Sequence, residues 1–138
     1  CNNFGYLTKG GYYKRVNGKK TFISKESNKF YTYVGTEASR CQIVELKEEF
    51  RGHKFWHRYS DKQLLELGNT IKYIGERDDI DYRKGLPELI KEKGSEAFNI
   101  CDVSMCNNTR GIWSHTNCST TKFDMFPQQE LMDMLISL

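Results

Sequence analysis

The chain has few prolines, no long apolar run and no leader-like start. Only two of its 138 residues are proline. No apolar run reaches the roughly 18 to 20 residues that a helix needs to cross a bilayer. No basic segment followed by an apolar one stands at the N-terminus, as it does in an intact signal peptide. The sequence therefore predicts neither a membrane-spanning chain nor an unprocessed secretory precursor.

The composition also excludes a disordered or fibrous protein. Hydrophobic residues make up 38% of the chain and charged residues 28%, which is typical of a globular protein with a packed core. A length of 138 residues is enough to close one hydrophobic core. We therefore expect a single domain over residues 1–138.

Motifs that mark common enzyme classes are missing as well. The sequence has no phosphate-binding glycine loop, no nucleophile elbow and no dinucleotide-binding fingerprint. It also has no internal repeat and no low-complexity tract. These absences favour a binding module over an enzyme.

Positive charge is concentrated in the first half of the chain. Residues 1–60 carry 12 Lys and Arg against 5 Asp and Glu, whereas residues 61–138 carry 9 against 13. The net charge of the whole chain, +3, hides this asymmetry. A basic segment is typical of proteins that bind nucleic acid or another polyanion.

The clearest local pattern is a β-hairpin around Asn17-Gly18. This pair tolerates the positive φ angles of a type I′ turn, whose twist matches that of paired strands. The β-prone runs cover residues 12–16, 19–23, 29–34 and 42–46. We expect Phe55, Trp56 and Tyr59 to add an edge strand or to cover one face of the sheet. We expect an N-terminal antiparallel sheet of three to four strands.

Helical spacing begins after Tyr59. Ser60 and Gln63 match a capping box, and apolar residues then recur at helical intervals until Gly75. Pro87 is typical of a first helical turn, with Gly94 as the stop, and Pro127 precedes a last amphipathic segment. Residues 95–122 are expected to be irregular. The fold class is therefore α+β, a sheet followed by two or three helices.

Basic and aromatic residues alternate through the predicted strands. Lys and Arg on one face attract phosphates, and exposed rings beside them stack on unpaired bases. Because side chains of a strand alternate between two faces, only some of these rings can be exposed. The candidate binding residues are Tyr13, Lys14, Arg15, Lys19, Lys20, Lys29 and Tyr31. The alternative is an ordinary lysine-rich surface that keeps a sheet edge soluble.

Three cysteines and one histidine cluster near the C-terminus. Cys101, Cys106, His115 and Cys118 have the form C-x4-C-x8-H-x2-C. Thiolate sulfur and imidazole nitrogen are the ligands that structural zinc prefers, although known sites favour closer pairs and a longer gap. We expect zinc as the possible cofactor, held by these four residues.

The same cysteines allow two other interpretations. In an exported protein, Cys101 would pair with Cys106 and Cys118 with Cys41, and Cys1 would be free or the lipid-modified first residue of a lipoprotein. Glycosylation sequons at Asn107 and Asn117 accompany this alternative, in which the protein binds a protein or a glycan. Otherwise the thiols pack as small apolar groups. We favour the intracellular alternative.

A small metal-dependent nuclease is the third alternative. Gly11-Tyr12-Tyr13 and Tyr33-Val34-Gly35, with Arg40 beyond, resemble the two tripeptides and the arginine of the GIY-YIG nucleases. That resemblance implies a strand-borne catalytic hairpin, yet the tripeptides lie farther apart than in that family. Ile43 to Lys47 resembles the Glu-x-Lys half of another nuclease core. Its partner aspartate is missing, since the first Asp is Asp61.

Overall fold

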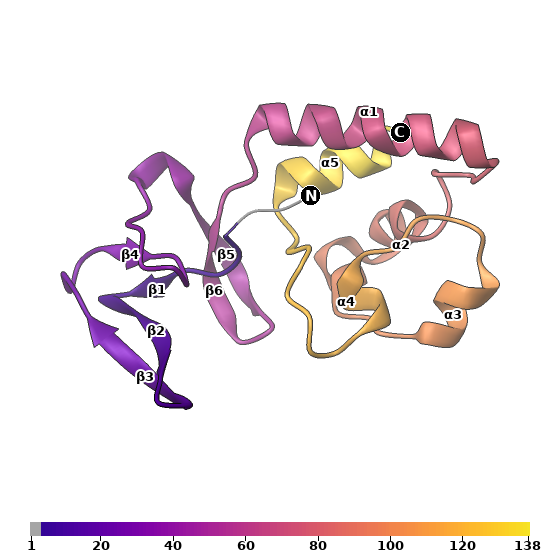
Figure 1. Ribbon diagram of the computed structural model, residues 1–138. Helices are drawn as coiled ribbons and strands as arrows, with labels where there is room; N and C mark the ends of the chain where they lie inside the picture. The colour runs from indigo at the N-terminus through magenta and orange to yellow at the C-terminus, as the bar shows by residue number, and fades with distance from the viewer. Residues whose placement is uncertain (1–3) are drawn as a thin grey trace. The chain divides into compact units, whose positions relative to one another are not determined.

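The computed structural model describes residues 4–138 and confirms the α+β class, with antiparallel strands followed by helices (Figure 1). Backbone contacts divide these residues into two compact units, a strand unit that ends at Arg58 and a helical unit over Tyr59–Leu138. A single domain over residues 1–138 stays a prediction. Cys1, the candidate for lipid attachment, lies outside the described residues.

The strand unit holds three antiparallel pairs. Its elements are β1 (Thr8–Lys9), β2 (Gly11–Val16), β3 (Lys19–Ser24), β4 (Phe30–Tyr31), the 3-10 turn η1 (Arg40–Gln42), β5 (Ile43–Phe50) and β6 (His53–His57). Strand β1 pairs with β4, β2 with β3 and β5 with β6, each as a separate two-stranded sheet. The continuous sheet of three to four strands that the β-prone runs indicate is therefore divided into three two-stranded pairs, of which β2–β3 and β5–β6 are hairpins.

Local backbone features explain why the strands stay short. Gly10 has φ 78° and separates β1 from β2, and this left-handed conformation favours glycine. Strand β4 ends after Tyr31 because the chain turns back on Thr32, whose carbonyl accepts a bond from the Gly35 amide at 2.9 Å. The expected strand over residues 29–34 is thus mostly a turn. Tyr33-Val34-Gly35, the second nuclease-like tripeptide, lies in that turn and not in a strand.

The core of the strand unit is aromatic. Trp56 is fully buried, and Phe50, Leu7 and Tyr31 are at most 6% exposed. The indole Nε1 of Trp56 donates to the His53 carbonyl at 3.0 Å, which satisfies the one polar atom of the buried ring. Burial of these large side chains supplies most of the free energy that holds three short strand pairs together.

The helical unit contains three longer and several short helices. They are α1 (Asp61–Asp78), α2 (Leu86–Lys93), the 3-10 helix η2 (Gly94–Phe98), α3 (Val103–Asn108), α4 (His115–Cys118) and α5 (Gln129–Ile136). Helices α1 and α2 both pack against α5. Leu131 and Leu135 of α5 are buried as the helical spacing indicates. No helix within residues 4–138 has the length and apolar character to cross a membrane.

The capping box at the start of α1 is confirmed, and its predicted end is not. The Ser60 side chain accepts from the Gln63 amide at 3.2 Å, and the Gln63 side chain accepts from the Ser60 amide at 2.9 Å. The helix continues past Gly75 to Asp78 and ends at the left-handed Asp79. Gly75 is needed for packing instead, since a Cβ there would lie 2.4 Å from the Tyr82 ring.

Candidate functional site

The β2–β3 hairpin is the most regular part of the strand unit, and its turn confirms the sequence prediction. Asn17 and Gly18 have φ angles of 50° and 77°, as a type I′ turn requires. The register pairs Tyr13 with Phe22, Lys14 with Thr21, Arg15 with Lys20 and Val16 with Lys19. This register fixes which side chains share a face.

Strand alternation divides the cations of the hairpin between its two faces. Tyr13, Arg15, Lys20 and Phe22 lie on one face, which we call the ring face. Lys14 and Lys19 lie on the opposite face, together with Thr21 and Val16. The sequence prediction placed all four cations on one surface. The hairpin instead presents two cations on each side.

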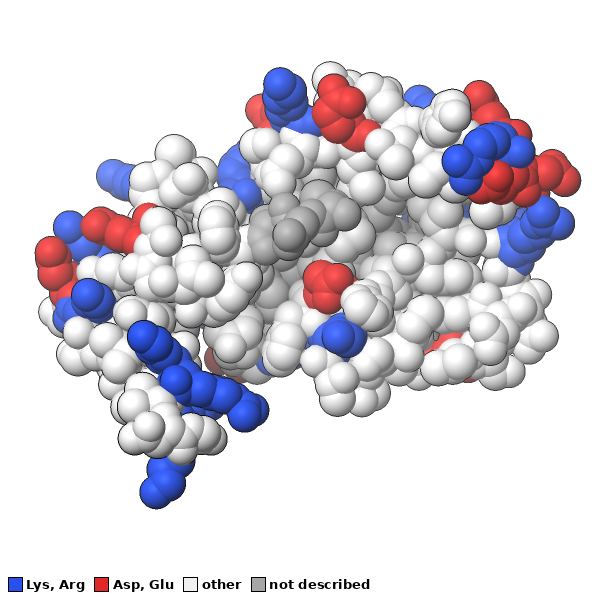
Figure 2. Space-filling model, viewed as in Figure 1, with Lys and Arg blue, Asp and Glu red and all other residues white. Residues whose placement is uncertain are grey.

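The ring face combines aromatic contact with positive charge. The rings of Tyr13 and Phe22 are 5.2 Å apart between centroids and remain 44% and 43% exposed. The Lys20 ammonium lies 4.6 Å from the centre of the Tyr13 ring, within the range of a cation–π contact. Lys and Arg side chains gather over this hairpin on the face drawn in Figure 2.

Acidic residues do not neutralise the hairpin. Within residues 4–138, no ion pair joins Lys14, Arg15, Lys19 or Lys20 to a carboxylate. Lys29 differs, because its ammonium lies 3.2 Å from carboxylate oxygens of both Glu26 and Glu37. Hydrogen bonds to these two carboxylates raise the pKa of Lys29. Its charge is therefore already compensated inside the strand unit.

Tyr31 and Tyr13, the two candidate rings, occupy opposite environments. Tyr31 is 6% exposed, and its hydroxyl accepts from the Glu26 amide at 3.3 Å. A buried ring cannot stack on a base, so Tyr31 contributes to the core. Tyr13 is the predicted ring that the structure leaves accessible.

His53 lies near Lys20 of the hairpin, which the sequence did not indicate. Its imidazole stacks on the Tyr6 ring at a centroid distance of 3.7 Å. Burial and the nearby charge of Lys20 lower the pKa of His53 below its usual 6.5. Local sequence patterns cannot indicate that residues 6, 20 and 53 are neighbours, because Tyr6 lies before β1 and the other two belong to β3 and β6.

In the helical unit, the structure gathers the three predicted thiols. Cys118 and Cys101 both lie close enough to Cys106 to affect the pKa of its thiol. Burial, followed by these neighbours, raises the pKa of the Cys106 thiol to about 11. Cys106 also lies 3.5 Å from the Asn117 carbonyl. No disulfide is formed by any cysteine within the described residues.

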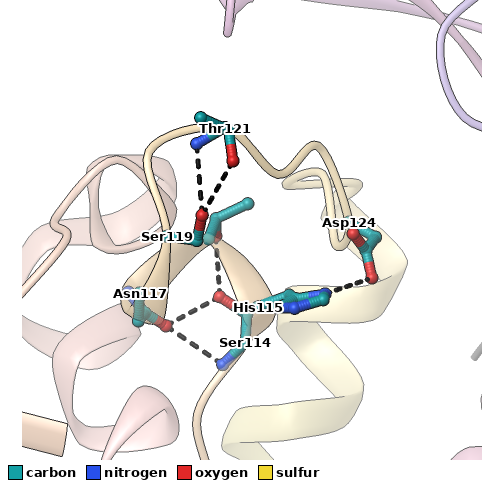
Figure 3. A network of polar contacts seen from close by, with 7 residues as sticks. Ser114, His115, Asn117, Ser119, Thr121 and Asp124 are labelled. Atoms are coloured by element: carbon teal, nitrogen blue, oxygen red, sulfur yellow. Dashed lines mark hydrogen bonds and ion pairs between the residues drawn. The ribbon is translucent and has the colours of Figure 1, made fainter. Parts of the chain in front are cut away.

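His115 takes a different partner from the predicted one. Its Nδ1 lies 3.2 Å from Oδ2 of Asp124, and both side chains are at least half exposed (Figure 3). Across residues 4–138, no three His, Cys, Asp or Glu side chains are arranged to hold a metal ion. Zinc bound by Cys101, Cys106, His115 and Cys118 stays a prediction that this arrangement does not support.

Asn117 is buried in a polar network that the sequence did not indicate (Figure 3). Its Oδ1 accepts from the amide and the hydroxyl of Ser114 at 3.1 and 2.7 Å. Its Nδ2 donates to the carbonyls of Ala97 and Ile100, both at 2.8 Å. The side chain is fully buried and fully hydrogen-bonded. The sequon at Asn117 is therefore not a surface signal, whereas Asn107 is exposed.

Comparison with known proteins adds no assignment. No protein-family model matches the chain, and no curated protein or solved structure is significantly similar to it.

Proposed function

We propose that the ring face of the β2–β3 hairpin binds single-stranded nucleic acid. The observation that carries the proposal is the exposed Tyr13–Phe22 pair with the Lys20 ammonium over the Tyr13 ring. Arg15 pairs with Lys20 across the strands, so two uncompensated cations flank the rings. Lys29 and Tyr31 are left out of this site, because one is ion-paired and the other buried.

The arrangement suits a base and its flanking phosphates. An aromatic ring with an accessible π-face stacks on any base, and each such contact contributes on the order of 1–3 kcal/mol. Arg15 and Lys20 supply the positive charge that attracts the phosphates on either side of the stacked base. A double helix offers no unpaired base to the rings. We therefore expect single strands to bind more tightly than duplexes.

The two faces of the hairpin provide a matched test. We compare R15A/K20A with K14A/K19A, which remove the same charge from opposite faces, by titrating a fluorescent oligothymidylate at several salt concentrations. Ring-face binding predicts that R15A/K20A loses about tenfold or more in affinity and that the slope of log K against log salt becomes shallower by about 1.4, because each phosphate contact on a single strand contributes about 0.7. K14A/K19A should lose far less.

Equal losses in the two variants would show attraction to overall charge and would overturn the ring-face proposal. Competition by heparin separates a general polyanion site from a nucleic-acid site. The proposal predicts that heparin competes only weakly at a charge concentration equal to that of the oligonucleotide, because heparin has no bases to stack. Equal competition would contradict it.

A second candidate is a divalent metal site at His115 and Asp124. One observation favours it, the 3.2 Å approach of two side chains of zinc-ligand type at an exposed position. Two side chains are fewer than the three that catalytic zinc usually receives from a protein. Zinc titration of the whole chain tests this candidate. It predicts that H115A and D124A abolish uptake and that C101S does not. If zinc uptake is lost in C101S and kept in D124A, the metal binds at the cysteine thiols and not at His115 and Asp124.

A further inference from the structure

Cys106 and Cys118 lie where α3 and α4 pack together. The Cys106 thiol lies 3.5 Å from the carbonyl oxygen of Asn117, the residue directly before Cys118, and Cys118 contributes to the raised pKa of that thiol. The two cysteines lie on different helices that pack together, so their approach is a property of the fold and not of adjacency in the chain.

Backbone contacts hold the two helices in this position. The carbonyl of Asn117, the residue before Cys118, accepts from the Asp102 amide at 3.0 Å and receives the Cys106 thiol at 3.5 Å. Asp102 caps α3 by accepting from the Met105 amide at 3.0 Å. The buried Asn117 side chain then fixes α4 to Ala97 and Ile100. Both thiols are therefore carried on backbone that is anchored at several points.

We propose that Cys106 and Cys118 form a reversible disulfide, with a small-molecule disulfide as the oxidant. This goes beyond the proposed nucleic-acid binding, because it concerns a modification site in the helical unit. It also differs from the pairs that the sequence suggested, Cys101 with Cys106 and Cys118 with Cys41. Cys41 contacts its own neighbour Ser39, at 3.3 Å between Sγ and Oγ.

Exposure sets the order of the two steps. Cys118 is exposed and Cys106 is partly buried, so Cys118 reacts first. Its thiolate attacks one sulfur of the oxidant, forms a mixed disulfide and expels one thiol. The Cys106 thiol then loses its proton and attacks the Cys118 sulfur, which expels the second thiol. The protein loses two electrons and two protons, and the oxidant is reduced to two thiols.

The bond would link α3 to α4 across the intervening loop, residues 109–114. A cross-link of this kind restricts the unfolded chain and thereby raises the free energy of unfolding. Oxidation should therefore stabilise the helical unit, and reduction should reverse the effect.

Peptide mapping tests the pairing in the full chain. The protein is equilibrated with reduced and oxidised glutathione, its remaining thiols are blocked, and it is cleaved after Arg110 and before Asp102. These cuts place Cys101, Cys106 and Cys118 on three different peptides. The expected product joins the Cys106 peptide to the Cys118 peptide, persists in C101S and disappears with excess reduced glutathione.

Variants of the two cysteines test the order of reaction. C106S should accumulate glutathione on Cys118, because no second thiol resolves the mixed disulfide. C118S should form neither product at Cys106. A dominant link through Cys101, or glutathione retained on Cys118 of the unchanged protein, would overturn the proposal. If C106S or C118S fails to fold, the maps of the unchanged protein and of C101S still decide the pairing.

Discussion

The β2–β3 hairpin and the segment around Asn117 use polar side chains in opposite ways. Asn117 is fully buried, and each of its polar atoms is bonded to a neighbour in the same unit. The cations of the hairpin are exposed and have no carboxylate partner within the described residues. Polar groups that are buried and hydrogen-bonded within the fold stabilise it. Polar groups that are exposed and have no partner in the fold are the candidates for binding. Removing the first kind should lower stability, and removing the second kind should weaken binding.

The largest effect should come from N117A, because it removes the hydrogen-bond partner of the Ser114 amide and of the Ala97 and Ile100 carbonyls. Each unsatisfied buried group costs about 1–3 kcal/mol, and partial relaxation lowers the sum. We expect a loss of about 3–4 kcal/mol in the free energy of unfolding. Urea denaturation followed by circular dichroism measures it. The control N108A removes an exposed asparagine from α3 and should change stability by less than about 0.5 kcal/mol.

Gln128, at the start of α5, is a second buried polar side chain. Its side chain accepts from the Tyr59 amide at 2.8 Å and donates to the Tyr59 carbonyl at 3.1 Å, and it is 1% exposed. Q128A should cost about 2 kcal/mol, since both backbone groups of Tyr59 lose their partner. Its neighbour Gln129 is exposed, so Q129A is the control. Similar losses in the free energy of unfolding of Q128A and Q129A would contradict the distinction between buried, hydrogen-bonded polar groups and exposed ones.

A change of Tyr13 should affect binding and spare stability. Y13L keeps an apolar side chain on the ring face and removes the aromatic surface. We expect about a tenfold loss of oligonucleotide affinity, equivalent to about 1.4 kcal/mol, with little change in the denaturation midpoint. Y13F keeps the ring and should bind almost as well as the unchanged protein. If Y13L binds the oligonucleotide as tightly as the unchanged protein, stacking of a base on Tyr13 is contradicted.

The smallest effect should be a pH dependence confined to the strand unit. Burial is the main cause that lowers the pKa values of His53 and His57 below 6.5. The unfolded chain then binds more protons than the folded one just below pH 6.5, so stability falls as the pH falls through this window. Denaturation of the W113F variant, followed by Trp56 fluorescence, should show lower midpoints at pH 5.5 than at pH 7.5. H53Q/H57Q should flatten that dependence, and an unchanged slope would contradict the assignment.

Local patterns predicted the local structure well. The Asn17-Gly18 turn and the Ser60 capping box depend on residues within a few positions of each other, and both are confirmed. The sequence prediction ended α1 at Gly75, three residues too early. Gly75 is a glycine because the Tyr82 ring packs against it, and helix propensity does not describe that contact. The segment 95–122 was expected to be irregular and contains short helices, which buried Asn117 helps to hold.

The candidate sites depend on contacts that local patterns do not contain. Sequence indicated the residue types of the hairpin, yet only the register shows that its cations divide between two faces. Burial removed Tyr31 from the candidate rings, and ion pairs compensated Lys29. The cysteine spacing suggested one site with His115. The fold instead places Cys106 beside Cys118 and His115 beside Asp124, because the loop after α4 returns Asp124 to that helix.

The most direct test of the central claim is a nuclear magnetic resonance titration of the whole chain with a short oligothymidylate. Binding at the ring face predicts that the largest chemical-shift changes fall on the side chains of Tyr13, Arg15, Lys20 and Phe22, while residues around Asn117 stay unchanged. Changes concentrated on Lys14 and Lys19, or spread through the helical unit, would contradict it.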